Sequence, residues 1–371
     1  MKVTPTHKPE RDRQIGLPEE PFMKRISSIF ARSGLVAALV IASPREVAAG
    51  KDDRDDRGAC ETLNLASTGG PIPRDPHLLV LRWTGYANFE LIYRGQILLL
   101  DAYFDRGSRY RPLGFAAADV TRGTAILLGH AHYDHMSDAA SIGSKLNIPV
   151  YGAPVTVEKL LTQPIDPKLI KTLTGRGGEV LQFDGFQVEP VLGLHSSAPA
   201  DLTAAYTAAY ATGVPPPTPE EAAEEAAIQA RGSTDPLILT EGSISFIFTF
   251  DTGFRLAWRD TGGDMTEYEQ AALARGGPVD VLLGSIAPLV IARLQAAVLL
   301  PMVRLYRPAV YLPSHHDERV GQLVDRATQP MFQAIKDKMP NVITISREYR
   351  EPVCFDTRRF TIKPFIPRRF R

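Results

Sequence analysis

The chain has 371 residues, of which 44% are hydrophobic and 23% are charged, and its 42 Lys and Arg residues equal its 42 Asp and Glu residues in number. This composition is typical of a globular protein with a large buried core. Zero net charge argues against a nucleic acid as the main partner, because binding a phosphate backbone requires a cationic excess. No apolar run approaches the roughly 20 residues of a membrane-spanning helix, so no stable transmembrane anchor is expected.

The N-terminal segment has the order of features of a secretory signal peptide. A largely polar lead of 22 residues precedes Met23, which opens a cationic stretch. An eight-residue apolar run (35–42) and small residues around Ala49 follow, as cleavable export signals require. We therefore expect residues 1–50 to be a tail with a signal peptide, and the protein to be periplasmic or secreted. If the segment is not used, the protein would be cytoplasmic.

The chain has two cysteines, Cys60 and Cys354. Neither lies in a CxxC pair, so a structural zinc knuckle and a dithiol redox site are not expected. Export would allow the two to form a disulfide that ties the ends of the folded domain together.

From residue 78 onward, apolar runs alternate with turn signals, which predicts strands in hairpins with helices between them. Asp184-Gly185 is a favoured two-residue hairpin turn. The predicted strands are 79–84, 90–94, 96–102, 124–129, 148–152, 179–183, 186–194, 243–250, 254–258, 279–286, 309–313 and 342–346, and the predicted helices are 155–161, 266–275, 291–306 and 325–338. This grouping predicts an α/β fold with two sheets between layers of helices.

Residues 198–236 interrupt this pattern, because they are rich in Ala, Pro, Thr and Glu. Pro219, which precedes two glutamates, suits the first turn of a helix. The segment is either a surface insertion or a lid or substrate wall, since it begins just after His195.

Four residues of metal-ligand type lie within six positions, directly after a predicted buried strand. They are His130, His132, Asp134 and His135. Imidazole nitrogens and carboxylate oxygens are ligands that zinc prefers. One ion could hardly accept all four with good geometry, so the cluster indicates two ions; the alternative is a histidine-rich surface loop.

The sequence HAHYDH at 130–135 resembles the HxHxDH signature of the metallo-β-lactamase-fold hydrolases. The segment WTGYANFELIYRGQILLLDAYF (83–104) is similar to the opening strands of the branch that holds ascorbate-6-phosphate lactonases and N-acyl-phosphatidylethanolamine phospholipase D. The resemblance covers roughly residues 79–346. It implies that residues 51–371 form an αβ/βα sandwich: two mixed β-sheets packed face to face, helices on the outer faces, and a two-metal site at one edge.

The resemblance also implies three further ligands. His195 ends a hairpin strand, as the third histidine of the family does. Asp260 is preferred over Asp251 as the bridging carboxylate, because the family motif follows the second strand of a hairpin and Asp251 lies in the turn. The family's usual glycine before this aspartate is replaced by Arg259, which leaves Asp251 as the alternative.

His315 is the preferred last ligand, because its Pro-x-His spacing matches the family, and His316 would then lie behind it or face the substrate. Only His7 and His77 fall outside the histidine constellation. The implied ligands are His130, His132 and His195 for one ion, Asp134, His135 and His315 for the other, and Asp260 between them. Asp101 and Asp138 could orient imidazoles or cap strand and helix ends.

These residues predict a hydrolase that uses two divalent ions, zinc by default with manganese or iron as alternatives. Two such ions can share a hydroxide and polarise the scissile bond, while Asp134 orients the hydroxide and hands a proton to the leaving group. The expected substrate is a small-molecule or lipid-like phosphodiester, lactone or carboxylic ester. The alternatives are a β-lactamase-type amide hydrolase, which generally lacks the bridging carboxylate, and a non-catalytic metal-binding module. Nothing in the sequence indicates an oligomeric state.

Overall fold

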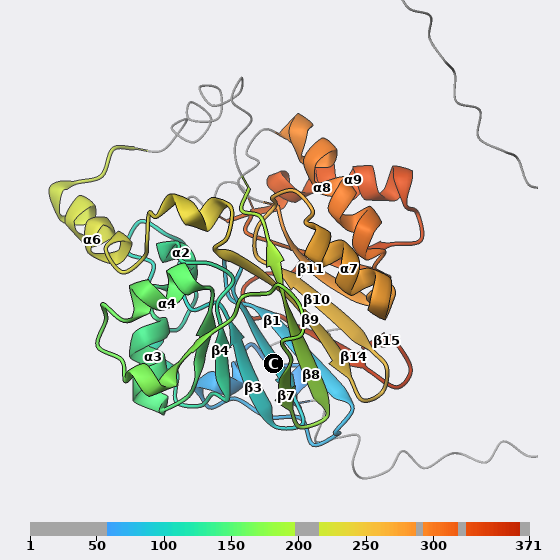
Figure 1. The fold of residues 1–371 in the computed structure, drawn as a ribbon, viewed down its shortest axis with the longest axis horizontal. Helices are drawn as coiled ribbons and strands as arrows, with labels where there is room; N and C mark the ends of the chain where they lie inside the picture. Colours follow the sequence, from blue (N-terminus) through green and yellow to red (C-terminus); the bar gives the residue numbers. More distant parts are fainter. Residues whose placement is uncertain (1–57, 197–214, 287–291, 318–323, 364–371) are drawn as a thin grey trace, which may run out of the picture. The chain divides into compact units, whose positions relative to one another are not determined.

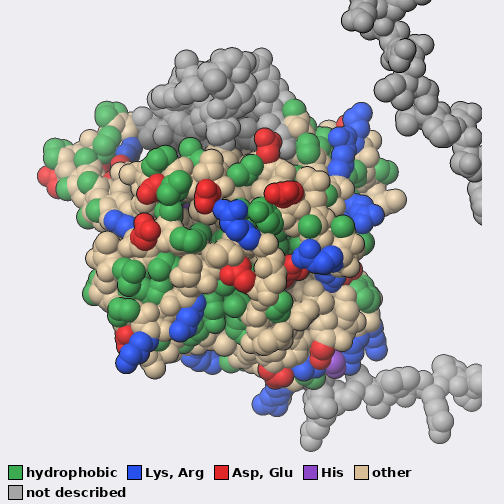
Figure 2. Space-filling model, viewed as in Figure 1, with side chains coloured by type: hydrophobic (Ala, Val, Ile, Leu, Met, Phe, Trp, Pro, Cys, Tyr) green, Lys and Arg blue, Asp and Glu red, His purple; other side chains and the backbone are tan. Residues whose placement is uncertain are grey.

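Two β-sheets form the centre of the structure, a computed structural model that describes residues 58–196, 215–286, 292–317 and 324–363 (Figure 1). The expected signal peptide lies outside the described residues. None of the described helices is long and apolar enough to cross a membrane. On the face shown in Figure 2, basic and acidic side chains are interspersed, in keeping with the zero net charge.

The first sheet has eight strands in the order β15-β14-β1-β2-β3-β4-β5-β6, antiparallel from β15 to β3 and parallel from β3 to β6. Its strands are β1 (Leu78–Trp83), β2 (Phe89–Tyr93), β3 (Gln96–Leu100), β4 (Ala125–Leu127), β5 (Val150–Gly152), β6 (Ile170–Thr172), β14 (Pro352–Asp356) and β15 (Thr361–Lys363).

The second sheet has seven strands in the order β13-β12-β11-β10-β9-β8-β7, parallel from β13 to β10 and antiparallel from β10 to β7. Its strands are β7 (Leu181–Phe183), β8 (Phe186–Gly193), β9 (Ser243–Phe250), β10 (Arg255–Arg259), β11 (Val281–Ser285), β12 (Val310–Ser314) and β13 (Ile343–Thr344). Both sheets are mixed, which confirms the predicted α/β sandwich.

Helices flank both sheets, with α3 and α4 beside β4 to β6 and α7 beside β8 (Figure 1). The α-helices are α2 (Tyr133–Met136), α3 (Ala139–Leu146), α4 (Pro154–Leu160), α6 (Pro219–Gln229), α7 (Glu267–Gly276), α8 (Ala292–Tyr306) and α9 (Val324–Lys338), and the 3-10 helices are η1 (Ala66–Thr68), η2 (Ala117–Asp119), η3 (Pro167–Leu169) and η5 (Pro236–Leu239). Thr266 caps α7 by accepting the Glu269 N–H, which satisfies a donor that the helix itself leaves unpaired.

The main core lies between the sheets. Strands that are buried on both faces contribute nearly continuous apolar runs to it. All six residues of β1 are buried. The ring of Tyr93 on the first sheet lies 4.8 Å from that of Phe250 on the second. Each fully buried side chain of this kind contributes about 1.5–3 kcal/mol to folding, so the interface between the sheets fixes their strand ends relative to each other.

The sequence predicted most of these elements but missed α3, β6 and the C-terminal edge of the first sheet. The helix expected from Pro219 is α6, and its Thr218 cap accepts the Glu221 N–H. The strand β14 was missed because its apolar run, PVCF, is too short to distinguish a strand by periodicity. Its identity depends on pairing with β1, in which Cys354 lies opposite Val80.

The predicted disulfide joins Cys60 to Cys354 across a sequence separation of 294 residues. It ties the segment before β1 to β14. Both cysteines are buried in a small apolar cluster with Ile97. The link therefore fixes the segment before β1 to the strand that pairs with β1.

Candidate metal centre

Residues from four strand ends meet in one cavity. The HAHYDH loop follows β4, His195 follows β8, Asp260 follows β10 and His315 follows β12. The carboxyl ends of the parallel strands β10 and β12 share an edge of the second sheet, which aims their following residues at the same point. The cavity is lined by His130, His132, Asp134, His135, His195, Ser196, Asp260, Thr261, Ser285 and His315.

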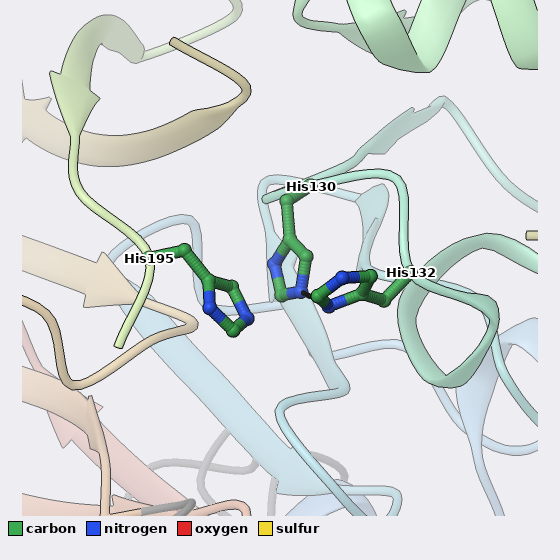
Figure 3. Close-up of side chains that lie close together, drawn as sticks. All are labelled: His130, His132 and His195. Carbon is green, nitrogen blue, oxygen red and sulfur yellow. Dashed lines mark hydrogen bonds between the residues drawn. The ribbon is translucent and has the colours of Figure 1, made fainter. Parts of the chain in front are cut away.

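Three histidines converge on one side of this cavity (Figure 3). His130 Nε2 lies 3.0 Å from His132 Nδ1, and the ring of His195 lies 4.6 Å from the rings of both. His195 Nδ1 lies 2.6 Å from the Ser196 carbonyl, so this nitrogen donates and Nε2 is left as the acceptor. One nitrogen of each ring lies within 4.8 Å of the other two, a spacing that a single ion can bridge.

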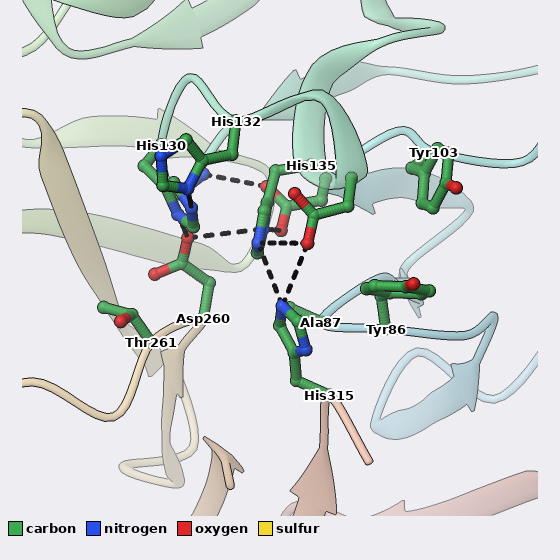
Figure 4. A network of polar contacts seen from close by, with 12 residues as sticks. Tyr86, Ala87, Tyr103, His130, His132, His135, Asp260, Thr261 and His315 are labelled. Atoms are coloured by element: carbon green, nitrogen blue, oxygen red, sulfur yellow. Dashed lines mark hydrogen bonds and ion pairs between the residues drawn. The ribbon is translucent and has the colours of Figure 1, made fainter. Parts of the chain in front are cut away.

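A second group of three lies beside the first (Figure 4). Asp134 Oδ2 is 3.2 Å from His315 Nε2 and 3.6 Å from His135 Nε2, and the two Nε2 atoms are 3.3 Å apart. His135 Nδ1 is held by Asp101 Oδ2 at 2.6 Å. Asp101 therefore orients an imidazole, one of the two roles considered for it, and turns His135 Nε2 toward the centre.

Asp260 lies between the two groups and is fully buried. Its Oδ2 is 2.5 Å from His130 Nδ1 and 3.5 Å from His135 Nδ1. Its Oδ1 is buried without a hydrogen-bond partner among the described residues. A buried acceptor without a partner is costly, and a cation in the cavity would satisfy it.

Gly129 makes this position of Asp260 possible. A Cβ at residue 129 would lie 1.9 Å from Asp260 Oδ2. Arg259, the departure from the family pattern, turns away from the cavity and donates to Glu269 at 2.7 Å. The glycine expected before Asp260 is therefore not needed, because a side chain there has its own buried partner.

The electrostatics of the cavity suit a cation. Burial, reinforced by neighbouring histidines, lowers the pKa of His195 to about 3 and that of His130 well below its usual range. Burial raises the pKa of Asp260 to about 7. Burial also opposes ionisation of Asp134, but His135 and His315 hold its pKa below the usual range. Divalent metals bind neutral imidazoles and ionised carboxylates. The lowered pKa values keep His130 and His195 neutral and Asp134 ionised, so these residues fit such an ion.

All seven predicted ligand residues thus lie at this cavity, and the rejected alternatives do not. Asp251 sits in the β9–β10 turn, 40% exposed, and pairs with Arg94. The ring of His316 stacks on Trp83 with centroids 4.3 Å apart. Asp138 accepts the backbone N–H groups of residues 104 and 105, a structural role rather than the orientation of an imidazole.

Sequence reasoning missed the hydroxyl groups of the cavity and the segment that braces its loop. Ser196, Thr261 and Ser285 line the cavity, but isolated Ser and Thr residues carry no sequence signal. The end of the Ala/Pro/Glu-rich segment packs on the HAHYDH loop: the Ser233 N–H donates to the Ala131 carbonyl at 2.7 Å. This part of 198–236 is therefore not a free surface insertion; residues 197–214 lie outside the described structure.

An αβ/βα sandwich with histidines and carboxylates clustered at one edge defines the metallo-β-lactamase fold. A family model described as the beta-lactamase superfamily domain matches residues 96–315, which is more than half of the chain. The chain belongs to this superfamily.

Two curated relatives and one solved structure give further detail. Metal-dependent hydrolases of Cereibacter sphaeroides and Agrobacterium fabrum are 28% and 32% identical over 118 and 123 residues, each match covering 32% of this chain. The matches span about half the length of these relatives, 49% and 48%. Igni18, a metallo hydrolase from Ignicoccus hospitalis, shares the fold with a TM-score of 0.50 at 15% identity, over 75% of this chain and 98% of that one.

Proposed function

We propose that the protein is a binuclear metal-dependent hydrolase of ester-type bonds, with phosphodiesters, lactones and carboxylic esters as candidate substrates. The observation that carries this proposal is the convergence of seven ligand-type residues on one buried cavity. The similarity to relatives that are named metal-dependent hydrolases supports it. His130, His132 and His195 would hold one ion, Asp134, His135 and His315 the other, and Asp260 would bridge them.

Two divalent ions supply Lewis acidity and a nucleophilic hydroxide at neutral pH. The nitrogen and oxygen donors favour zinc, and manganese or iron also suit them. The chain's own residues orient the reactants. Asp134, whose lowered pKa keeps it ionised, accepts a hydrogen bond from the attacking water and passes the proton to the leaving group. The hydroxyls of Thr261 and Ser285 can donate to substrate oxygens.

Asp260 favours ester-type substrates over lactams, because the bridging carboxylate is typical of the phosphoester and lactone hydrolases in the resemblance described above. Its burial between both groups of ligands suits that bridging position. The β-lactamase-type and non-catalytic alternatives are tested by the same substrate panel.

The test compares metal-stripped and reconstituted protein on p-nitrophenyl phosphodiesters, acyl lactones and nitrocefin. We expect zinc, manganese or iron to restore ester hydrolysis, and His132→Ala to abolish it. His77→Ala is the matched control, because this histidine directly precedes β1 and does not line the cavity. Turnover of nitrocefin alone would replace the proposal with the amide alternative. Two bound ions with no turnover of any substrate would favour a non-catalytic module.

We further propose that the protein is exported. The Cys60–Cys354 disulfide supports this, because disulfides persist mainly in oxidising compartments. Cell fractionation with N-terminal sequencing of the mature protein is the test. Cleavage near Ala49 is expected, and a full-length cytoplasmic protein with reduced cysteines would contradict export.

A further inference from the structure

A buried ion pair lies directly behind the second group of ligands. Arg106, in the loop after β3, and Asp317, two residues after His315, are each 4% exposed. Arg106 Nη1 lies 2.9 Å from Asp317 Oδ2. Removing two charges from water is costly unless their geometry and further hydrogen bonds compensate. We therefore expect further hydrogen bonds around this pair.

The pair is connected to His315 through the backbone of Tyr86. The Tyr86 N–H donates to Asp317 Oδ1 at 2.9 Å, and the His315 N–H donates to the Tyr86 carbonyl at 2.7 Å. The same carbonyl accepts from Trp83 Nε1 at 2.7 Å. Asp317 therefore anchors Tyr86, the residue whose carbonyl accepts the main-chain N–H of His315.

Both linked residues adopt left-handed backbone conformations. Tyr86 has φ 47° and His315 has φ 57°. Bulky L residues rarely occupy this region, and they remain there only when the surroundings over-determine the conformation. The reciprocal bonds between the two segments supply that constraint. Without them, His315 would lose the backbone conformation that directs its ring toward Asp134.

Aromatic rings enclose the guanidinium and fix its position. The centre of the Arg106 guanidinium lies 4.6 Å from the ring of Tyr86 and 5.6 Å from that of Tyr349. Tyr349 also accepts from Arg106 Nη1 at 3.1 Å and donates to Asp317. A Cβ at Gly85 would lie 2.5 Å from Arg106 Nη1. A planar cation of this shape fits the enclosure, and an ammonium would fill it less well.

We propose that Arg106 and Asp317 are positioning residues that fix His315 for the second metal ion. This inference rests on the binuclear function proposed above. It assigns the loop after β3 a role in assembling the centre. It also predicts an asymmetry: disturbing the pair weakens binding of the second ion and leaves His130, His132 and His195 able to hold the first.

A second buried ion pair provides the matched control. Arg82 Nη1 lies 3.1 Å from Glu90 Oε1, and these side chains are 0% and 1% exposed. Glu90 accepts the backbone N–H groups of Ala66 and Ser67, so this pair anchors the segment before β1. Among the described residues, neither side chain forms a hydrogen bond or ion pair with a residue that lines the cavity. Arg82→Lys thus reproduces the chemical change of Arg106→Lys away from the centre.

The experiment titrates the full metal-stripped chain with zinc alone, against a competing chelator, and counts bound zinc by mass spectrometry. We expect two zinc ions per wild-type chain. Loss of an outer residue that orients a ligand weakens metal affinity by about 10–100-fold, so we expect about 10-fold weaker binding of the second ion in Arg106→Lys and about 100-fold in Arg106→Gln. The first ion should keep its affinity in both variants, and Arg82→Lys should bind both ions as the wild type does.

Wild-type affinity for both ions in Arg106→Lys and Arg106→Gln would overturn the inference. Equal weakening of both ions, reproduced by Arg82→Lys, would also overturn it, because that pattern indicates general destabilisation. If Arg106→Gln does not fold, Arg106→Lys, which keeps the charge, decides alone. A wild-type chain that binds fewer than two ions would remove the binuclear function itself, whereas two ions with the expected asymmetry but no ester hydrolysis would remove only the catalytic proposal.

Discussion

The two halves of the candidate centre are held in different ways. The first half (His130, His132 and His195) depends on the strand ends that carry its loops and on the Ser196 carbonyl, which orients His195. The distant side chain that holds it is Asp260, which contacts His130 and is shared with the second half. The second half (Asp134, His135 and His315) depends on side chains from distant segments. Asp101 orients His135, and the Arg106–Asp317 pair holds the turn that carries His315.

This difference implies different sensitivities to substitution. The backbone of a strand end is fixed by sheet hydrogen bonds, so a ligand next to it keeps its place when a single side chain changes. A ligand held by a chain of polar contacts shifts when any member is lost, because buried networks couple their members. We therefore expect the second half to lose its ion first when the centre is perturbed.

The substitution with the largest expected effect is Gly129→Ala, which should disturb both halves of the centre. The new Cβ would fall 1.9 Å from Asp260 Oδ2, so the carboxylate between both halves must move. A displacement of about 1 Å in a catalytic group can reduce turnover by about 100-fold, and we expect kcat/KM for the best ester substrate to fall by at least that factor, with weaker binding of both ions. Gly58→Ala is the control, because a Cβ there meets nothing within 4 Å. Retention of activity by Gly129→Ala would show that Asp260 is not essential.

The two halves also differ in how much of their support could be predicted from the sequence. The HAHYDH loop was predicted as metal-binding because its ligand-type residues are adjacent in sequence and follow a buried strand. His195, Asp260 and His315 were predicted to join it because each follows a predicted strand in the order that the family resemblance requires, and the structure brings all of them to one cavity. Contacts between distant side chains could not be predicted: nothing near Arg106 in the sequence indicates that it reaches Asp317, and nothing near Ser233 indicates that it binds the Ala131 carbonyl.

Asp101→Asn should affect only the second half. Asparagine tolerates the left-handed backbone of residue 101, at φ 61°, and can still accept the Gly129 N–H. It cannot supply the charge that holds His135 Nδ1 at 2.6 Å. We expect the second zinc ion to bind about 10–100-fold more weakly and the first to bind normally, as measured by chelator competition. Equal loss of both ions would argue against independent halves.

Gly232→Ala should produce a smaller change that reaches both halves. A Cβ at residue 232 would lie 2.2 Å from the Tyr133 nitrogen, in the loop between His132 and Asp134. Since this backbone must shift to admit the methyl group, we expect kcat/KM to fall by about 10-fold and stability by about 1–3 kcal/mol, measured by steady-state kinetics and urea unfolding. Gln229→Ala, an exposed change at the end of α6, should alter neither. Wild-type kinetics in Gly232→Ala would show that this segment does not brace the loop.

Asp138→Asn should leave both halves intact and change only how stability depends on pH. Burial raises the pKa of Asp138 from its ordinary value of 3.8 to about 6. Between these values the folded chain binds more protons at this site than the unfolded chain, so raising the pH through the window destabilises the fold. Asparagine does not titrate, and its carbonyl oxygen can still accept the N–H groups of residues 104 and 105. Between pH 4 and pH 7 the wild type should therefore lose on the order of 3 kcal/mol relative to Asp138→Asn, measured by urea unfolding of the metal-free chains. A stability difference that stays constant over this range would mean that Asp138 titrates normally, and weakened zinc binding in the variant would mean that it supports the second half as Asp101 does.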